Sequence, residues 1–423
     1  MDIHSQVSID IREIADSFRR KLQTLRFSSQ ESCCIYRVPQ PIRCLNPSDY
    51  TPHLISIGPL HHGKAKLKAM EEQKIRYLEH FRQRTQVSLE EFLELIKNKE
   101  AELRACYGEI IELESEDFVK IIFIDAVFLI EYLLRDFNPC FRTNDDLIFS
   151  KPWTEDHTYY DMWLVENQLP IFILNDLFNL AKTATYDDCY RGLDLITISR
   201  NFRSCIRTFV PIDVNLLESR FSEAAHFLDL LRLGIQPSQP RTKTKFRVQS
   251  IPTAIELHQA GVKFKSSSSK TLLDISFNEG ILEIPLLDVY DQTQRFYRNI
   301  LAFENMHSHT RYFNDYVKIM SYLLITAKDA ELLIQNGIVG PGNSERLSTV
   351  FHNLNKDSSL TPSFYYSALV EALQNYRRYP YHKWKAILKQ NYFNSPWASI
   401  SVIAAVILLV LTFIQATCSI IAL

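Results

Sequence analysis

The stretch FVKIIFIDAVFLIEYLL, residues 118–134, decides how the rest of the chain is interpreted. It is long and apolar enough to suggest a membrane span, but Lys120, Asp125 and Glu131 interrupt it. Each such charge costs about 2.5 to 3.5 kcal/mol at the centre of a bilayer. The stretch therefore predicts a buried core helix, around which a large helical body packs.

Helical patterns lie on both sides of this stretch, because apolar residues recur there every three or four positions. Another helical pattern begins near Tyr159 and must end or kink at Pro170 before it resumes through Leu180, since proline cannot continue the backbone hydrogen bonding of a helix. The other predicted helices cover residues 7–25 (amphipathic), 64–84, 88–112, 117–135, 215–233, 253–260, 316–334 and 364–376.

Non-helical segments are marked by proline, glycine and β-branched residues. Residues 36–59 contain five prolines and are predicted to form an ordered loop. Residues 234–250 resemble a linker, and the basic run from Arg241 to Arg247 within them is either a solvated surface or a contact for anionic lipid or an acidic partner. Strand patterns at 262–265, 272–277 and 281–286, with a turn at 278–280, predict a β-hairpin element.

The composition excludes several classes of protein. With 423 residues and 46% hydrophobic content the chain can form a large core, and only 10 glycines argue against a turn-dense all-β fold. A net charge of −2 provides little attraction for the phosphates of nucleic acid, so nucleic acid is not an expected partner. The eight cysteines contain no CxxC pair and are predicted to be free thiols in a reducing compartment.

The carboxyl-terminal segment is the strongest candidate for a membrane helix. Residues 390–423 contain no charge, and an all-round apolar helix of about 20 residues crosses a hydrocarbon core of about 30 Å. The alternative is a buried C-terminal helix covered on every side by protein. The predicted anchor residues are Trp397, Ile400, Val402, Ile403, Val406, Ile407, Leu408, Leu409, Val410, Leu411, Phe413 and Ile414.

Basic residues precede this segment and none follows it, so the positive-inside rule places the bulk of the protein in the cytosol. The sequence thus predicts a tail-anchored, single-pass membrane protein with membrane lipid as one partner. The predicted fold is mainly α: a large helical body, a small β-hairpin element near 262–287 and one C-terminal transmembrane helix. Its predicted organisation is an N-terminal extension (1–32), a helical domain (33–390) with a candidate internal linker (234–250), and an anchor (391–423).

Two polar motifs invite a chemical interpretation. His61-His62 could bind metal, but consecutive side chains diverge and no acidic or cysteine partner has ligand spacing, so a capping or hydrogen-bonding role is favoured. Glu166-Asn167-Gln168 precedes Pro170 and is expected to satisfy backbone groups that the proline leaves unpaired. Glu166 could instead be a general base, but no histidine, serine or second carboxylate stands near it in a recognised arrangement. No metal, cofactor or catalytic residue is predicted.

Several blocks in order resemble the plant family called Domain of Unknown Function 247, also known as uncharacterised protein family 0481. They are CCIYRVP (33–39), SIGPLHHG (56–63), DAVFLIE (125–131), ENQLP (166–170), HFLDLL (226–231), ELHQAGVKF (256–264), LEIP (282–285), RNILAFE (298–304) and YFNSPW (392–397). The family-motif residues are Cys34, Tyr36, Pro39, Gly58, Pro59, His61, His62, Gly63, Glu166, Asn167, Gln168, Pro170, Gly261 and Phe264.

The resemblance implies a flowering-plant protein, generally with a C-terminal membrane helix and without an assigned catalytic activity. Some members of the family are implicated in grass self-incompatibility, and others in stress or developmental responses. We therefore expect a non-enzymatic interaction or signalling protein with an unidentified protein partner. The alternatives are a determinant of pollen–stigma recognition, or an unrecognised enzyme in which Glu166, His61 and His62 are the first residues to substitute.

Overall fold

The computed structural model describes residues 11–24, 32–183, 185, 188–205, 210–237, 250–307, 310–340, 344–360, 362–378 and 396–421. Helices dominate these residues, as the sequence predicts, and the buried apolar side chains form one continuous core that runs from Cys34 to Leu373.

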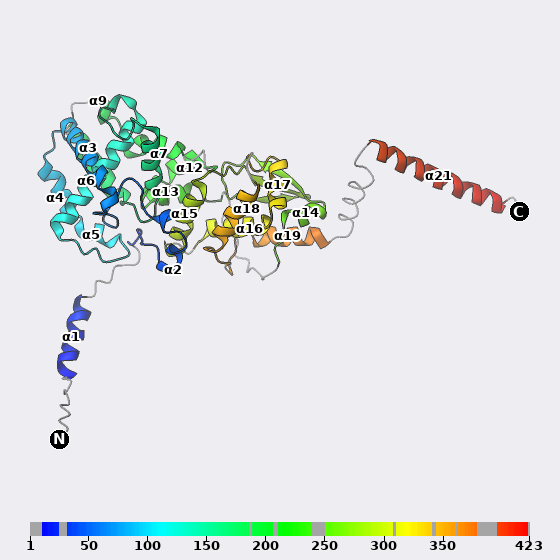
Figure 1. Cartoon of the computed structure of the whole chain (residues 1–423), viewed down its shortest axis with the longest axis horizontal. Coiled ribbons are helices and arrows are strands. Elements are labelled where there is room, and N and C mark those ends of the chain that lie inside the picture. Colours follow the sequence, from blue (N-terminus) through cyan, green and yellow to red (C-terminus); the bar gives the residue numbers. More distant parts are fainter. Residues whose placement is uncertain are drawn as a thin grey trace, which may run out of the picture.

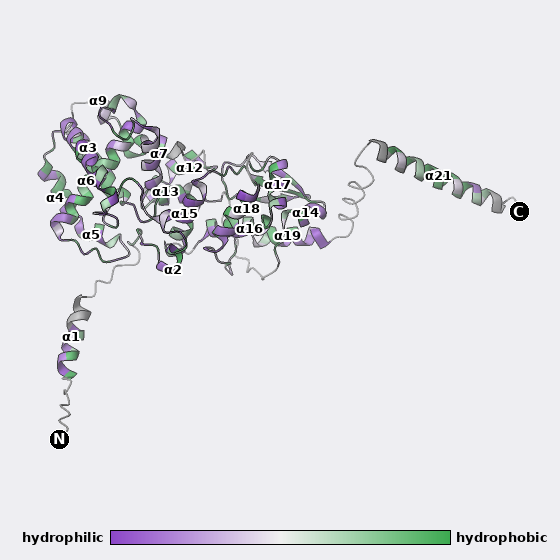
Figure 2. Ribbon diagram, viewed as in Figure 1, coloured by the Kyte–Doolittle hydropathy of each residue, from purple (hydrophilic) through white to green (hydrophobic). Residues whose placement is uncertain are grey.

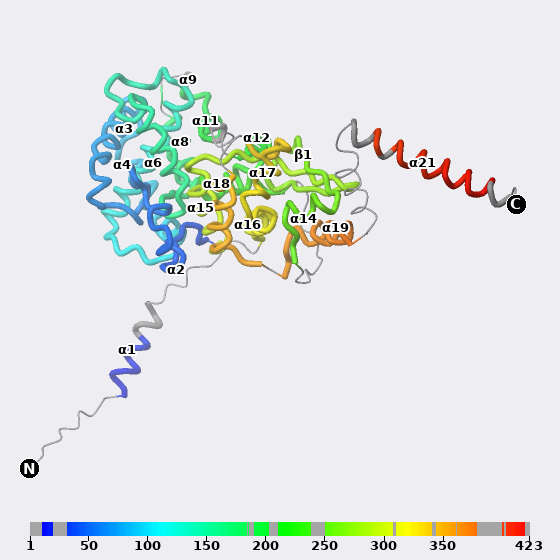
Figure 3. The backbone as a smooth tube through the Cα atoms, turned by 45° about the vertical axis from the view of Figure 1, so that its right-hand side comes forward, coloured from blue at the N-terminus to red at the C-terminus, as the bar shows by residue number. Residues whose placement is uncertain are grey.

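The long helix α6 (Ser115–Phe137) lies at the centre of the amino-terminal half of the body, where Figures 1 and 3 both place it among its neighbours. It packs against α3 (Glu71–Arg84), α4 (Leu89–Asn98) and α8 (Ile171–Thr183). Its side chains are buried almost all round, so the predicted core helix is confirmed.

The remaining elements of this half are short. The predicted helix over 88–112 is two helices, because Lys99 leaves the helical conformation between α4 and α5. The bounds are α2 (Gln40–Arg43), η1 (Pro47–Tyr50), η2 (Ala65–Met70), α5 (Glu100–Ala105), η3 (Pro139–Phe141), α7 (Pro152–Asp161), α9 (Asp188–Arg191), α10 (Leu195–Ile198) and α11 (Arg200–Cys205).

Two further predicted helices are also divided in the second half. The pattern over 215–233 becomes α12, η5 and α13, and the pattern over 316–334 is split because Thr326 begins a new helix with a capping box to Asp329. The bounds are α12 (Val214–Ser219), η5 (Phe221–Glu223), α13 (Phe227–Gly234), α14 (Ala254–Gln259), α15 (Thr293–His307), α16 (Tyr312–Leu323), α17 (Ala327–Gln335), α18 (Ser344–Asn355) and α19 (Ser367–Arg378).

A three-stranded sheet interrupts the helices, with the strand order β1-β3-β2. Strands β2 (Ser276–Asn278) and β3 (Ile281–Pro285) form the predicted hairpin, whose two-residue turn has positive φ at both Glu279 and Gly280. The sequence did not predict that β1 (Lys263–Ser267) pairs parallel to β3. The predicted strand over 272–277 begins only at Ser276, and most of the linker predicted at 234–250 lies outside the described residues.

The amino-terminal helix α1 (Ile11–Thr24) stands apart from the body (Figure 1). Apolar and polar residues alternate around it in Figure 2, and both Ile11 and Phe18 are exposed. The amphipathic helix is thus confirmed over these residues, and its predicted ends at Val7 and Leu25 lie outside the described part of the chain.

The helix α21 (Pro396–Ile421) occupies the segment that was predicted to be the membrane anchor. A bilayer crossing requires about 20 consecutive, predominantly apolar residues in one helix. Within the described residues, no helix satisfies both the length and the apolarity that such a crossing needs. This finding contradicts the predicted transmembrane helix, and with it the tail-anchored topology and the single-pass membrane localisation. The prediction of membrane lipid as a partner depended on that helix and loses its basis with it.

Candidate functional site

The proline-rich segment from Val38 to Pro59 folds over the core with little regular structure beyond α2 and η1. A buried backbone without regular hydrogen bonding leaves amide groups that need other partners. Buried side chains from α6, from the end of α7 and from the motif before Pro170 supply them. The candidate functional site is this segment together with the polar side chains that hold it.

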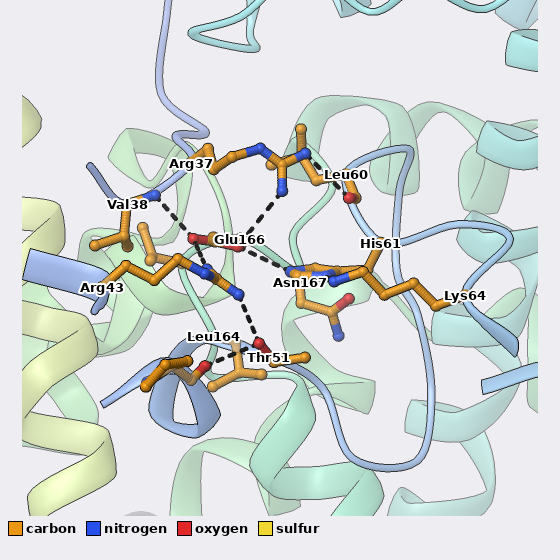
Figure 4. Close-up of polar contacts among 12 residues, drawn as sticks. Arg37, Val38, Arg43, Thr51, Leu60, His61, Lys64, Leu164, Glu166 and Asn167 are labelled. Carbon is orange, nitrogen blue, oxygen red and sulfur yellow. Dashed lines mark hydrogen bonds and ion pairs between the residues drawn. The ribbon is translucent and has the colours of Figure 1, made fainter. Parts of the chain in front are cut away.

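Glu166 is the centre of the site (Figure 4), and its side chain is fully buried. Its Oε1 atom accepts hydrogen bonds from the Val38 amide at 2.8 Å and from the Arg43 guanidinium. Its Oε2 atom lies 3.0 Å from His61 Nε2 and 3.9 Å from Arg37 NH1. Burial raises the pKa of the Glu166 carboxyl, but the hydrogen bonds from His61 and Val38 and the charge of Arg43 together bring that pKa below its usual value.

His61 connects Glu166 to the surface. Burial lowers the pKa of His61, whose ring lies between two charged groups: Nε2 is 3.0 Å from a carboxylate oxygen of Glu166, and Nδ1 faces Lys64. Lys64 Nζ lies 2.5 Å from that Nδ1 atom, and burial together with the nearby charge of Arg43 lowers the pKa of Lys64. The three side chains form a continuous chain from an exposed amine to a buried carboxylate.

The amides further along the segment are held in the same way. The carboxylate of Asp161 accepts hydrogen bonds from three consecutive amides, those of residues 53–55, at 2.7 to 3.0 Å. Asn167 Oδ1 accepts from the Ile57 amide at 2.7 Å, and Asp125 Oδ2 accepts from the Gly58 amide at 2.8 Å. Lys74 Nζ lies 2.6 Å from the second oxygen of Asp125 and compensates its charge.

The motif 166–170 is only partly what the sequence predicted. The helix expected from about Tyr159 to Pro170 is not formed, because α7 already ends at Asp161 and residues 162–170 are not helical. Gln168 Nε2 donates to two carbonyls after that end, those of Met162 and Leu164, at 2.7 and 2.8 Å. Glu166 and Asn167 accept hydrogen bonds from backbone amides of the proline-rich segment, which lies more than a hundred residues away in the sequence. The sequence shows no histidine in a recognised arrangement with Glu166, but the fold brings His61 to 3.0 Å from it.

A second buried ion cluster lies on α6. Glu131 pairs with Arg84 at 2.5 Å and with Arg135, whose guanidinium also lies 3.2 Å from Asp146. The Tyr77 hydroxyl donates to Asp146 at 2.9 Å. All of these groups are paired with each other, so the cluster explains how α6 carries charges inside the core rather than indicating a reactive site.

The other predicted site residues are scattered. His62 is exposed and lies outside the Glu166 network, while Gly58 and Gly63 have positive φ values of 71° and 76°. Gly261, with a positive φ of 95°, lies in the turn before β1, and Phe264 is in the strand itself. Trp397 and Val402 are in α21, but their side chains are outside the description, as are residues 392–395 of the motif before it. No three His, Cys, Asp or Glu side chains are placed to share a metal ion in the described ranges.

Sequence reasoning missed an exposed aromatic surface beside the segment. The Trp153 side chain on α7 is 60% exposed, and its ring stacks on His157 with centroids 4.1 Å apart. The ring of His157 lies 6.2 Å from that of His53, whose backbone amide is held by Asp161. The signal available in the sequence was a tryptophan in a helix that is otherwise polar at that turn, residues 151–157.

Comparison with known proteins identifies the family. The family model of Domain of Unknown Function 247, described as a plant protein of unknown function, matches residues 35–411. The chain belongs to this family. The UPF0481 protein At3g47200 of Arabidopsis thaliana is 27% identical over 94% of this chain and 88% of its own length. A second Arabidopsis thaliana UPF0481 protein, At3g02645, is 23% identical over 90% of this chain and 89% of its own.

No solved structure matches this chain significantly. In this chain the SIGPLHHG and ENQLP blocks are in direct contact, through His61 with Glu166 and through Ile57 with Asn167. The predicted role in pollen–stigma recognition stays a prediction, since no residue described above bears on it.

Proposed function

We propose that this protein is a non-enzymatic interaction protein, and that it binds a protein partner through the aromatic surface formed by Trp153, His157 and His53. The observation that carries the proposal is the arrangement around α7. The buried end of that helix fixes the backbone of residues 53–55 through Asp161, while its exposed start presents the stacked rings of Trp153 and His157. The surface therefore exposes aromatic rings on a backbone that buried groups hold in place.

An exposed indole supports partner binding for an energetic reason. Tryptophan is among the residues enriched at binding hot spots, because its large rigid face loses little conformational entropy when it is covered. The indole is already immobilised by stacking, and His157 Nδ1 donates to the Trp153 carbonyl at 2.9 Å. Binding thus requires little further ordering of these side chains.

The polar groups of the site support the same proposal. Glu166, Asn167, Asp161 and Asp125 all use carboxylate or amide oxygens to accept backbone amides of the proline-rich segment. These oxygens hold a loop in one conformation, which is what a binding surface needs.

The experiment compares proximity labelling and affinity capture by the full chain and by Trp153→Ala. The matched control is Ile110→Ala, which removes another apolar side chain that is 87% exposed. We expect a partner that binds the wild type and the control, and whose purified form binds Trp153→Ala at least about 30-fold more weakly, as a hot spot of about 2 kcal/mol requires. The proposal would be contradicted if the partner bound the wild type, the control and Trp153→Ala equally. It would also be contradicted if the wild type captured no protein in greater amount than Trp153→Ala does.

A second candidate function is an enzyme, or a protein that accepts an acyl group, in which Lys64 is the nucleophile. Lys64, His61 and Glu166 stand in the order of a nucleophile, a base and a group that orients the base, at 2.5 and 3.0 Å. Against this candidate, His61 and Glu166 are fully buried, and the two cavities described in the chain are lined by other residues.

This candidate has its own test. If it is correct, a limiting amount of an amine-reactive acyl probe should label Lys64 before Lys66 and Lys68, and His61→Gln should abolish that preference. Equal labelling of the three lysines would reject it. His62 is not part of the triad, so His62→Gln serves as the control.

A further inference from the structure

Two cysteines far apart in the sequence face each other across a short backbone pairing. Ile35 and Tyr107 form an isolated parallel bridge, in which the Cys34 and Ile35 amides both donate to the Cys106 carbonyl at 2.9 Å. The Gly108 amide completes the bridge by donating to the Ile35 carbonyl at 2.8 Å. This register places Cys34 directly opposite Cys106.

The pairing satisfies the geometric requirement of a disulfide. Neighbouring strands lie about 4.7–4.9 Å apart, and disulfides join residues whose Cα atoms are about 4.4–6.8 Å apart. Both cysteines are free and buried, and the Cys106 thiol donates to the Glu102 carbonyl at 3.4 Å.

We propose that Cys34 and Cys106 form an oxidisable pair, which a peroxide converts into an intramolecular disulfide and a dithiol reductant restores. This inference is independent of the proposed partner binding. It identifies a modification site between the CCIYRVP block and the end of α5.

The reaction has a defined order. The neighbouring Cys34 thiol lowers the pKa of the Cys106 thiol even though burial opposes it, whereas the Cys106 thiol and burial both raise the pKa of Cys34. The Cys106 thiolate attacks one peroxide oxygen, the O–O bond breaks, and a sulfenic acid and hydroxide form; the hydroxide takes a proton and leaves as water. The Cys34 thiol then attacks the sulfenic sulfur, the S–O bond breaks, and a second water leaves with the thiol proton.

The bond would tie the proline-rich segment to the body. The Cys34 carbonyl already accepts from His226 Nε2 at 3.0 Å, and the Val38 amide four residues later donates to Glu166. A link from Cys34 to Cys106 closes a long loop that contains this segment, α3 and α4. Closing such a loop restricts the unfolded chain and stabilises the folded one.

The full-length protein is treated with hydrogen peroxide, alkylated and mapped by mass spectrometry without reduction. We expect one cross-linked peptide pair that contains Cys34 and Cys106, is lighter by two hydrogen atoms and disappears after treatment with a dithiol. The midpoint of thermal unfolding should rise by about 5 °C on oxidation of the wild type and of Cys140→Ser, but not of Cys106→Ser.

Cys33 provides the discriminating outcome, because it precedes Cys34 and is partly exposed. A disulfide that uses Cys33 in place of Cys34 would overturn the proposal, as would over-oxidised cysteines without any cross-link, or no reaction at all. The mapping is done on the wild-type chain, so a variant that fails to fold does not affect the result.

Discussion

The carboxylate of Asp161 lies 3.3 Å from the guanidinium of Arg295, and both side chains hold the same stretch of backbone. Asp161 accepts the amides of residues 53–55, and Arg295 donates to the Thr51 carbonyl at 3.0 Å. The end of α7 and the start of α15 therefore fix one loop from two sides. The loop conformation depends on a charge pair that is almost entirely buried.

We predict that Asp161→Asn lowers the free energy of unfolding by about 3 kcal/mol. The amide keeps one acceptor, so some of the three backbone amides lose their partner and Arg295 becomes a buried charge without a counterion. Denaturant unfolding measures the change. The control is Asp16→Asn, which breaks an exposed ion pair with Arg19 and should cost less than about 1 kcal/mol. Equal costs for the two variants would contradict the prediction.

Gly58→Ala should destabilise the protein more than Gly63→Ala. Both glycines have positive φ, so each alanine has a conformational cost of about 1 kcal/mol. A Cβ atom on Gly58 would also lie 2.9 Å from the Gln168 carbonyl oxygen and 2.9 Å from the Tyr107 hydroxyl, while one on Gly63 meets nothing within 4 Å. We expect a difference of about 2 kcal/mol in the free energy of unfolding. A difference near zero would contradict the prediction, because it would mean that the proline-rich segment can shift away from Gln168 and Tyr107 at little cost.

The helical core was predictable because it depends on local patterns. The charges in residues 118–134 indicated burial in protein, and α6 is indeed buried among neighbouring helices. Helix ends were less predictable: the breaks at Lys99 and Thr326 arise where capping and packing override a continuous apolar period. The parallel pairing of β1 with β3 depends on contacts between separate segments, and no local pattern encodes it. The expected transmembrane helix was contradicted.

The sequence identified several residues of the candidate site, but it did not identify the contacts between them. The sequence singled out His61 and Glu166 as polar residues in unusual surroundings, yet their contact joins positions 105 residues apart and only the fold reveals it. The same holds for Lys74 and Asp125, whose charges compensate each other inside the core. Trp153 was missed, because an exposed tryptophan and a buried one look alike in a sequence.

Glu304 should make stability decrease as the pH rises from 4.5 to 7. Burial raises the pKa of its carboxyl from 4.5 to about 7, although the amides of Phe313 and Asn314 and the charge of Arg232 lower it. Between these values the folded state keeps a proton that the unfolded state has released, so stability is fully present below pH 4.5 and is lost as the pH passes 7.

The expected loss is about 3 kcal/mol relative to Glu304→Gln, which cannot ionise. Denaturant unfolding of both proteins at several pH values measures it. Parallel pH profiles for the wild type and the variant would show that Glu304 is ionised in the folded protein and would contradict the prediction.

His226 should have the opposite effect. Burial lowers the pKa of its ring from 6.5 to about 4, while the charge of Asp229 and the Cys34 carbonyl raise it. The neutral ring accepts the Asp229 amide at Nδ1 and donates from Nε2 to the Cys34 carbonyl, which caps α13 and holds the start of the proline-rich segment. As the pH falls from 6.5 to 4, the unfolded chain binds a proton at His226 that the folded protein does not bind. The free energy of unfolding therefore decreases by about 3 kcal/mol.

His226→Asn retains a side chain that can cap the helix but removes this titration, so the free energy of unfolding of this variant should fall less steeply over the same pH range. If the wild type and His226→Asn lose stability equally on acidification, the ring is charged in the folded protein and the assignment of its hydrogen bonds is wrong.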